Sequence, residues 1–158
     1  MTIKPLELTA ESFKEFGSVL SSEVGAPAAD NDEIKYWGKL SQFSLGSDVS
    51  TGIMYVKKRQ PVLESFERHL QTPEMLVALE GDSVVCFAKK SPYGSDEIGE
   101  VKAFYIKQGD AFVMSPGTWH WAGYPKNDAA KFLVVFKYGT EEKDLEVKNV
   151  SEKVTVDI

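Results

Sequence analysis

The only two histidines of the chain, His69 and His120, both stand among residues that could bind a metal. His69 lies two residues after Glu67, and Glu74 follows it after four intervening residues. On a strand, positions 67 and 69 point the same way, so a carboxylate and an imidazole would converge from one strand. A Pro-Gly turn precedes His120 and would present it on a later strand.

Two imidazoles and two carboxylates favour a first-row divalent ion. The predicted ligands His69, Glu74, His120 and Glu67 suit Ni, Mn, Fe or Zn. No softer metal is expected, because the single cysteine, Cys86, lies in an apolar run typical of a buried strand. A glutamate bound tightly to a metal is a poor base, so Glu67 and Glu74 are not expected to share one role.

Short strands would position these residues. A helix is expected at about residues 9–17, with Thr9 as its N-cap and Gly17 as its stop. Strands are predicted, from a hydrophobic period of two, at 42–45, 52–57, 74–79, 83–88, 102–106, 111–114 and 131–137, with an edge strand at 153–158. Many short strands after one helix predict an all-β sandwich or barrel.

Length and composition are those of one ordinary globular domain. The 158 residues are expected to form a single domain, with a core at about 35–139 and a C-terminal extension at 140–158. The net charge of −6 does not suggest a nucleic-acid partner, and no apolar run approaches the roughly 20 residues of a membrane helix. With no visible secretory signal and one cysteine, a cytoplasmic location is expected.

The two histidine-containing stretches resemble the two cupin motifs, in which a His-x-His, a Glu and a later His bind a metal. Within the cupins, the chain is similar to the ureidoglycolate lyase family. The segments that carry this match, in order between residues 8 and 139, are 8–13, 16–19, 67–69, 102–104 and 117–120. The resemblance implies a cupin double-stranded β-helix, a jelly-roll barrel, with a short N-terminal helix.

The chain also departs from both patterns. Glu67 stands where the first cupin histidine usually lies, and Ser115 stands where the second motif usually has proline. Compared with the lyase family, Glu74 replaces glutamine, Trp121 replaces a second histidine and Phe136 replaces an aspartate. Glu74 restores the general cupin metal pattern, whereas the other two replacements remove polar groups that could bind substrate.

Four further residues are candidates for substrate binding. Lys58, Lys102 and Lys137 lie where the family carries arginine, and any of them could bind a carboxylate, although lysine lacks the bidentate fork of arginine. Tyr36 could line the mouth of a pocket. The competing interpretations are a solvated strand end for Lys58 and a core aromatic for Tyr36.

The resemblance implies a metal-assisted lyase that splits ureidoglycolate into glyoxylate and urea, with Glu67, Glu74 and His120 as catalytic residues. The metal would chelate the substrate's carboxylate and hydroxyl, and a glutamate would accept the hydroxyl proton. No residue is nominated as the acid for the departing nitrogen. The alternatives are another metal-dependent cupin enzyme, such as an isomerase or dioxygenase, and a non-catalytic cupin that binds a small ligand.

A homodimer is expected, partly because the resemblance implies one. If His120 faces the barrel interior, Trp119 and Trp121 lie on the opposite face of their strand. We expect both tryptophans to point outward, where a partner subunit could cover them.

Overall fold

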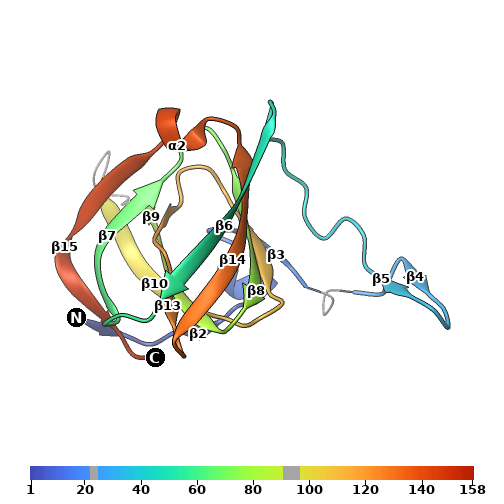
Figure 1. Ribbon diagram of the computed structural model, residues 1–158, viewed down its shortest axis with the longest axis horizontal. Coiled ribbons are helices and arrows are strands. Elements are labelled where there is room, and N and C mark those ends of the chain that lie inside the picture. The colour runs from blue at the N-terminus through green and yellow to red at the C-terminus, as the bar shows by residue number, and fades with distance from the viewer. Residues whose placement is uncertain (22–24, 91–96) are drawn as a thin grey trace.

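Two curved sheets face one another and make up the body of the molecule. The computed structural model describes residues 1–21, 25–90 and 97–158. Figure 1 shows the two sheets as a barrel-like body from which a small hairpin projects to one side. In the described part of the chain, neither helix is long and apolar enough to cross a bilayer.

The smaller sheet is antiparallel throughout. Its strands lie in the order β3-β11-β8-β14-β6. Their bounds are Gly17–Leu20 for β3, Ala111–Met114 for β11, Glu74–Glu80 for β8, Ala129–Lys137 for β14 and Val49–Lys57 for β6. β6 lies at one edge and pairs with β14 along its whole length.

The larger sheet has the order β1-β15-β7-β12-β9-β10-β2, and β13 pairs with β9 beside this path. The bounds are Thr2–Ile3 for β1, Glu146–Val156 for β15, Val62–Arg68 for β7, Trp119–His120 for β12, Ser83–Lys90 for β9, Ile98–Ile106 for β10, Leu6–Glu7 for β2 and Tyr124–Pro125 for β13. Only the β1–β15 and β2–β10 pairs are parallel among these pairings of the described residues. The all-β prediction with a short N-terminal helix is therefore confirmed.

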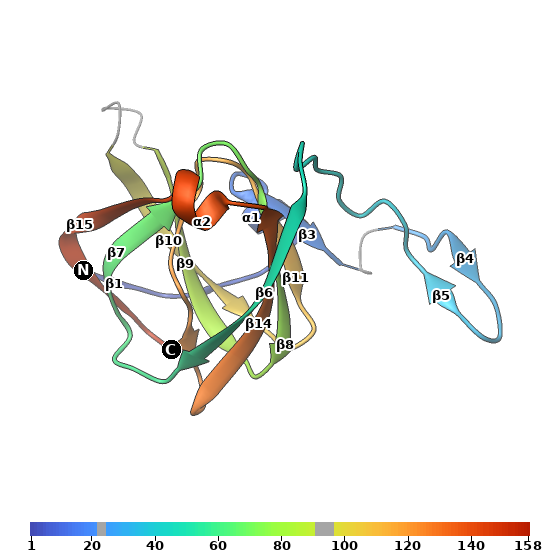
Figure 2. The ribbon, with the colours of Figure 1, turned by 45° about the horizontal axis from the view of Figure 1, so that its top comes forward.

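Two short helices and a hairpin complete the described structure. Helix α1 spans Ala10–Phe13 and helix α2 spans Thr140–Lys143. Strands β4, Ala29–Asp30, and β5, Lys35–Tyr36, form a two-stranded hairpin of their own. Figures 1 and 2 both show this hairpin standing clear of the two sheets.

The first hydrophobic core fills the space between the sheets. Phe13 and Phe16 enter it from the α1 region and meet Phe87, Phe104 and Phe112 from three strands. The ring centroids of Phe13 lie 5.0–5.5 Å from those of these three strand residues, in edge-to-face geometry. This aromatic cluster explains why so short a helix is held firmly against the barrel.

A second core lies on the opposite face of the larger sheet. Along β9, Val85 and Phe87 enter the first core, whereas Val84, Cys86 and Ala88 enter the second. The second cluster draws its members from strands of this one sheet, so the sheet curls around its own side chains. The prediction that Cys86 is a buried strand residue is confirmed, since only 1% of it is exposed.

The prediction that Trp119 points outward is wrong. Trp119 lies opposite His120 on β12, as alternation requires, but its side chain is fully buried in the second core. Trp121 is half-buried and packs against the same cluster. The curling of the larger sheet turns what would be an outer face into an interior, which removes Trp119 as an argument for a dimer interface.

Two predictions of local structure also need correction. The expected helix at 9–17 ends after one turn, and Gly17 begins β3, which pairs with β11. Only glycine fits at position 17, because a Cβ there would stand 1.8 Å from the Val113 carbonyl oxygen. Thr9 does cap the helix, its Oγ1 accepting the Ser12 N–H at 3.1 Å. Residues 42–45 form no strand, because neither sheet offers them a ladder in the described structure.

Candidate metal centre

Three of the predicted ligands meet at one end of the space between the sheets. His69 directly follows β7, Glu74 begins β8 and His120 ends β12. Their ligand atoms all lie within 4.8 Å of one another, and all three side chains are buried. Glu74 Oε2 lies 3.1 Å from Nε2 of His69 and 3.1 Å from Nε2 of His120.

Backbone carbonyls determine which nitrogen of each imidazole carries hydrogen. His69 Nδ1 lies 2.8 Å from the Asp144 carbonyl oxygen, and His120 Nδ1 lies 3.0 Å from that of Thr118. A carbonyl can only accept, so each Nδ1 donates its hydrogen. A neutral imidazole then has a bare lone pair on Nε2, which is the tautomer that metal-binding histidines use.

The converging atoms leave hydrogen-bonding capacity unused. Glu74 Oε2 and His120 Nε2 are both buried, and among the described residues neither has a well-aligned hydrogen-bond partner despite their 3.1 Å separation. Buried polar groups of this kind are rare and costly. Two imidazole nitrogens and a carboxylate directed at a common point favour a cation among them, so the residues present fit a divalent metal ion.

The same contacts shift the pKa values of the metal-free groups. Burial alone would raise the pKa of Glu74, but the nearby imidazoles of His120 and His69 outweigh it and lower the pKa to about 2. Burial alone would lower the pKa of His120, yet the charge of Glu74 raises it to about 9. Without a metal, Glu74 is therefore ionised near neutral pH, and its negative charge attracts a cation to the cluster.

Asp144, which the sequence did not suggest, holds the His69 segment in place. Its carboxylate oxygens accept the backbone N–H groups of Leu70 at 2.9 Å and Gln71 at 2.8 Å, in addition to the His69 bond to its carbonyl. Asp144 is the C-cap of α2, so this short helix after β14 becomes part of the site. We therefore assign Asp144 as a positioning residue for His69.

Glu67 stands beside this cluster and remains accessible. It lies directly opposite His120 in the β7–β12 pair, with its Oε1 at 3.7 Å from His120 Nε2. One third of its side chain is exposed, against less than a tenth for Glu74. Its neighbour Arg68 points to the other face and pairs with Glu146 at 2.7 Å, so Arg68 does not neutralise Glu67.

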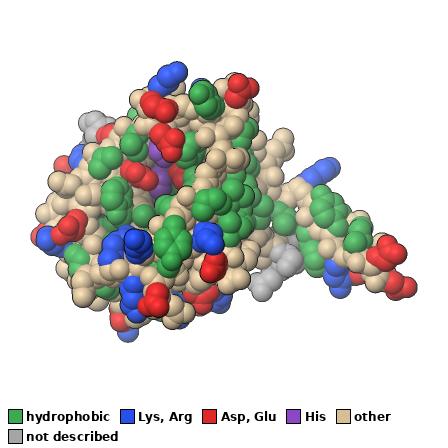
Figure 3. Space-filling model, in the orientation of Figure 1, with side chains coloured by type: hydrophobic (Ala, Val, Ile, Leu, Met, Phe, Trp, Pro, Cys, Tyr) green, Lys and Arg blue, Asp and Glu red, His purple; other side chains and the backbone are tan. Residues whose placement is uncertain are grey.

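A cavity of about 570 Å³ opens onto the cluster. Its lining residues come from β6, β7, β8, β14 and the α2 region, and are Ser50, Thr51, Gly52, Ile53, Met54, Glu67, His69, Glu74, Val134, Phe136, Glu141 and Leu145. Figure 3 shows a histidine at the bottom of this hollow with acidic side chains gathered beside it. The described lining contains no lysine or arginine.

The four predicted substrate-binding residues do not line this cavity. Tyr36 lies on the projecting hairpin, and Lys58 lies beyond the far end of β6, where its Nζ donates to the Lys126 carbonyl at 3.3 Å. Lys102 forms an ion pair with Glu15 near α1. Lys137 ends β14 near the cavity, but alternation turns it away from the face that carries Phe136.

Comparisons with known proteins identify the family of the chain. A family model described as ureidoglycolate lyase matches residues 1–157, and no curated protein matches the chain significantly. A mutant oxalate decarboxylase of Bacillus subtilis is 14% identical with a TM-score of 0.46, and the match covers 65% of this chain and 24% of that one. A dTDP-6-deoxy-D-glucose-3,5-epimerase of Legionella pneumophila is 16% identical with a TM-score of 0.45, covering 61% and 51% of the two chains.

Hazelnut (Corylus avellana) vicilin is 15% identical with a TM-score of 0.46, and the match covers 90% of this chain but 39% of vicilin. The chain thus spans about a quarter to a half of the solved structures named here. The family model, by contrast, covers nearly every residue. The chain belongs to the ureidoglycolate lyase family.

Proposed function

We propose that the protein is a metal-assisted carbon–nitrogen lyase that splits ureidoglycolate into glyoxylate and urea. Family membership suggests the reaction. One observation supports the metal-centred chemistry: the buried Glu74 Oε2 lies 3.1 Å from Nε2 of both histidines, in the wall of a cavity of about 570 Å³.

His69, Glu74 and His120 would hold the ion, with Mn, Fe, Ni and Zn as candidates for this set of nitrogen and oxygen ligands. A divalent ion bound there supplies a Lewis acid that lowers the pKa of a substrate hydroxyl. Since no cationic side chain is among the described lining residues, the metal ion would supply the positive charge that the substrate carboxylate needs.

Glu67 is the residue best placed to move a proton. It lines the cavity beside His120 but is not one of the three buried ligands, so its carboxylate remains free to act as a base. Lys58, Lys102, Lys137 and Tyr36 have no direct part in this step, because none of them lines the cavity.

In the proposed reaction, Glu67 transfers one proton from the substrate hydroxyl to the leaving nitrogen. The Glu67 carboxylate takes the proton of the substrate hydroxyl, the O–H electron pair becomes the second bond of the glyoxylate carbonyl, and the C–N bond breaks with its pair on nitrogen. Protonated Glu67 then returns that proton to the leaving nitrogen, releasing urea. Glu67 thereby serves as both base and acid.

Glyoxylate release from ureidoglycolate tests this assignment in protein loaded with each candidate metal. We expect Glu67→Gln to lower kcat by about 10²–10⁴-fold, as removal of a general base does, while leaving metal affinity nearly unchanged. Glu64→Gln is the matched control, because Glu64 lies on the same strand but lies outside the cavity lining and pairs with Lys153.

The lyase proposal fails if metal-loaded wild-type protein releases glyoxylate no faster than His120→Ala. Calorimetric titration with the same metals then decides separately whether His69, Glu74 and His120 bind an ion. A protein that binds metal stoichiometrically but leaves ureidoglycolate intact would keep the metal centre and lose the reaction.

A further inference from the structure

Strand β6 carries a glycine, Gly52, in its inner part. The φ angle of Gly52 lies outside the left-handed region, so the backbone conformation does not require glycine there. All nine residues of β6 pair with β14 without a register shift, so there is no bulge at this position. A Cβ on Gly52 would meet no heavy atom of the described chain within 4 Å, apart from its immediate neighbours. Glycine weakens a strand, and it often marks a place where a ligand approaches the backbone closely.

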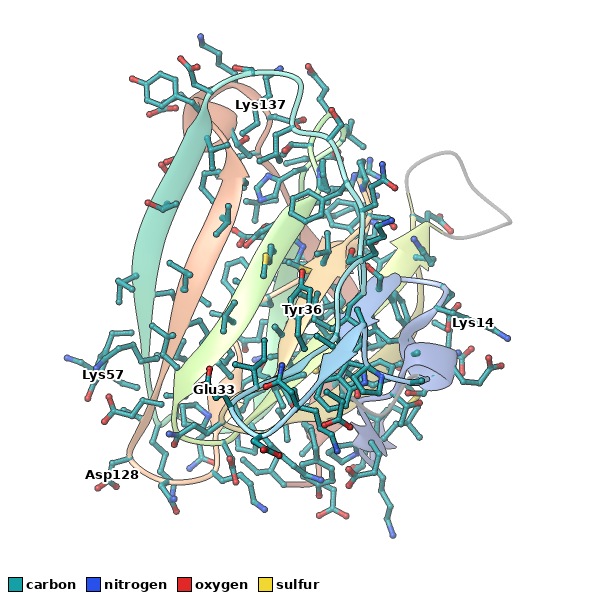
Figure 4. All side chains as sticks on the ribbon, turned by 90° about the vertical axis from the view of Figure 1, so that its right-hand side faces the viewer. Lys14, Glu33, Tyr36, Lys57, Asp128 and Lys137 are labelled. Carbon is teal, nitrogen blue, oxygen red and sulfur yellow. The ribbon has the colours of Figure 1, made fainter. Side chains whose placement is uncertain are left out.

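Gly52 faces the cavity. Along β6, Ser50, Gly52 and Met54 share one face of the strand because side chains alternate, and Met54 packs against the first core. All three residues line the cavity. Figure 4 shows β6 beside β14, with Lys57 and Lys137 at opposite ends of the pair. The missing side chain at Gly52 therefore leaves an open space in the wall that β6 contributes.

This open space lies one row of residues away from the candidate metal ligands. Gly52 pairs with Val134, whereas Ser50 pairs with Phe136, two residues further along β14. The ring centroid of Phe136 lies 6.0 Å from that of His69. Two residues correspond to about 7 Å along a strand. A ligand bound near His69 therefore needs only a short extension past Phe136 to reach Gly52.

The surroundings of Gly52 differ from the metal end of the cavity. At the metal end the lining residues are the titratable groups already described. Around Gly52, β6 and β14 contribute mainly apolar side chains together with two hydroxyls, namely Ser50, Thr51, Ile53, Met54, Val134 and Phe136. Figure 3 shows hydrophobic side chains along the β6 and β14 side of the hollow. The cavity therefore has one polar end and one mainly apolar end.

The size of the cavity exceeds what ureidoglycolate needs. Its volume of about 570 Å³ is that of pockets that enclose drug-sized ligands, which run from roughly 300 to 1,000 Å³. Ureidoglycolate is much smaller than such ligands and is polar at both ends, so it would leave the apolar end of the cavity unfilled. The cavity fits a ligand that carries an apolar group as well as a polar one.

We propose that the space at Gly52 is a subsite for an apolar substituent, so that this protein binds 2-hydroxy acids that carry an aliphatic or aromatic group. The inference rests on the proposed function for the position of the acid end at the metal ligands, and it adds the substrate class that the rest of the cavity selects. Gly52 is then a specificity-determining residue, because any larger side chain there would occupy the space that the substituent needs.

Calorimetric titration of the full chain loaded with Mn tests this subsite with two probes, glycolate and 3-phenyllactate. Both probes carry the hydroxyl and the carboxylate, and they differ by one benzyl group. We expect 3-phenyllactate to bind wild-type protein about tenfold more tightly or better, because its ring is buried in the apolar end. Gly52→Val should remove most of this advantage, and Gly52→Ala should remove a smaller part, while both variants bind glycolate and Mn as wild type does.

Stability measurements separate this role from a structural one. Valine favours strands, so the urea midpoint of Gly52→Val should equal or exceed that of wild type although its affinity for 3-phenyllactate falls. Val49→Ile is the control on the same strand, because it enlarges a side chain that is 52% exposed and lies outside the cavity lining. It should bind both probes as wild type does.

The proposal is overturned if wild-type protein binds 3-phenyllactate no more tightly than glycolate, or binds neither. It is also overturned if Gly52→Val retains the full preference, or weakens both probes equally. Since 3-phenyllactate has no C–N bond to break, the result does not depend on turnover. A protein that prefers 3-phenyllactate but leaves ureidoglycolate intact would keep the subsite and lose the lyase reaction, and one that splits ureidoglycolate but binds both probes equally would do the reverse.

Discussion

Strands β7 and β12 contribute charged side chains to two faces of their sheet. The charged groups on these two faces differ in how completely they are paired. On the second-core face, Arg68 pairs with Glu146 at 2.7 Å and stacks on Trp119, with its guanidinium carbon 4.2 Å from the ring centroid. On the cavity face, His120 and Glu74 approach to 3.1 Å, yet neither buried atom has a well-aligned hydrogen bond within the described residues.

This difference separates a buried charge that is fully paired within the fold from buried charged groups that are available to bind another species. Arg68 is almost completely buried, but it is paired and stacked, so the second core can contain it without needing any other molecule. The cavity face keeps a buried carboxylate close to two imidazoles, and among the described residues neither Glu74 Oε2 nor His120 Nε2 has a well-aligned hydrogen bond. A fold tolerates such a cluster where binding supplies the missing partner.

The largest effect is expected on the second-core face. Trp119→Ala removes a fully buried indole and leaves Arg68 without its stacking partner, which should lower the free energy of unfolding by about 3–5 kcal/mol. Urea denaturation measures this. Trp119→Phe is the milder comparison, because it keeps an aromatic ring and removes an N–H that has no hydrogen-bond partner among the described residues.

A loss below about 1 kcal/mol for Trp119→Ala would contradict the view that this face is structural. Reduced metal affinity in the folded Trp119→Phe protein would equally show that the two faces are not independent.

The next effect concerns the cavity face. Glu74→Ala should weaken binding of Mn or Ni about 100-fold, or about 2.7 kcal/mol, because the two imidazoles lose the anion between them. Calorimetric titration gives the affinity. Glu80→Ala is the control at the exposed end of the same strand, where the carboxylate pairs with Lys131 at 2.6 Å. Equal affinity in both variants would remove Glu74 from the metal site.

A smaller effect is expected from Asp144. Asp144→Ala keeps the backbone carbonyl that accepts from His69 but loses the carboxylate bonds to Leu70 and Gln71, so metal affinity should fall about tenfold. Hydrogen exchange should become faster at these two amides. Glu142→Ala, on the same helix, should change neither quantity. Unchanged exchange in Asp144→Ala would show that the Asp144 carboxylate does not hold the Leu70 and Gln71 amides in place.

The smallest effect is at Cys86, where no reaction is expected. Burial raises the pKa of this thiol to about 12, so hardly any thiolate forms near pH 8 in the native protein. Iodoacetamide should label it only after denaturation, as mass spectrometry would show. Rapid labelling of native protein would mean that the second core opens readily.

The convergence of His69, Glu74 and His120 could be predicted because each lies in a short stretch that resembles a cupin motif. Alternation correctly places Trp119 opposite His120. Curling of the larger sheet has no such local sign, which is why the outward position expected for Trp119 was wrong. The strand predicted at 42–45 failed for a related reason, since its alternation is suitable but no neighbouring strand pairs with it.

Asp144 could not be found in this way. Its main contribution to His69 is a backbone carbonyl, which any residue possesses, and the contact spans 75 positions in sequence. Likewise, the absence of lysine from the described cavity lining depends on which face each strand turns inward. Lys137 illustrates this, because a shift of one position on β14 separates it from the cavity face that carries Phe136.

The contacts of Asp144 with His69, Leu70 and Gln71 bear on the order of folding and metal binding. His69, one of the three proposed ligands, is oriented by a segment that follows β14, so the proposed ligand set would be complete only after the last strand of the smaller sheet has joined its neighbours. In small zinc domains the ion itself organises an otherwise unfolded chain. In this protein the barrel would have to close before the proposed site could bind an ion, so metal binding would follow folding and would not drive it.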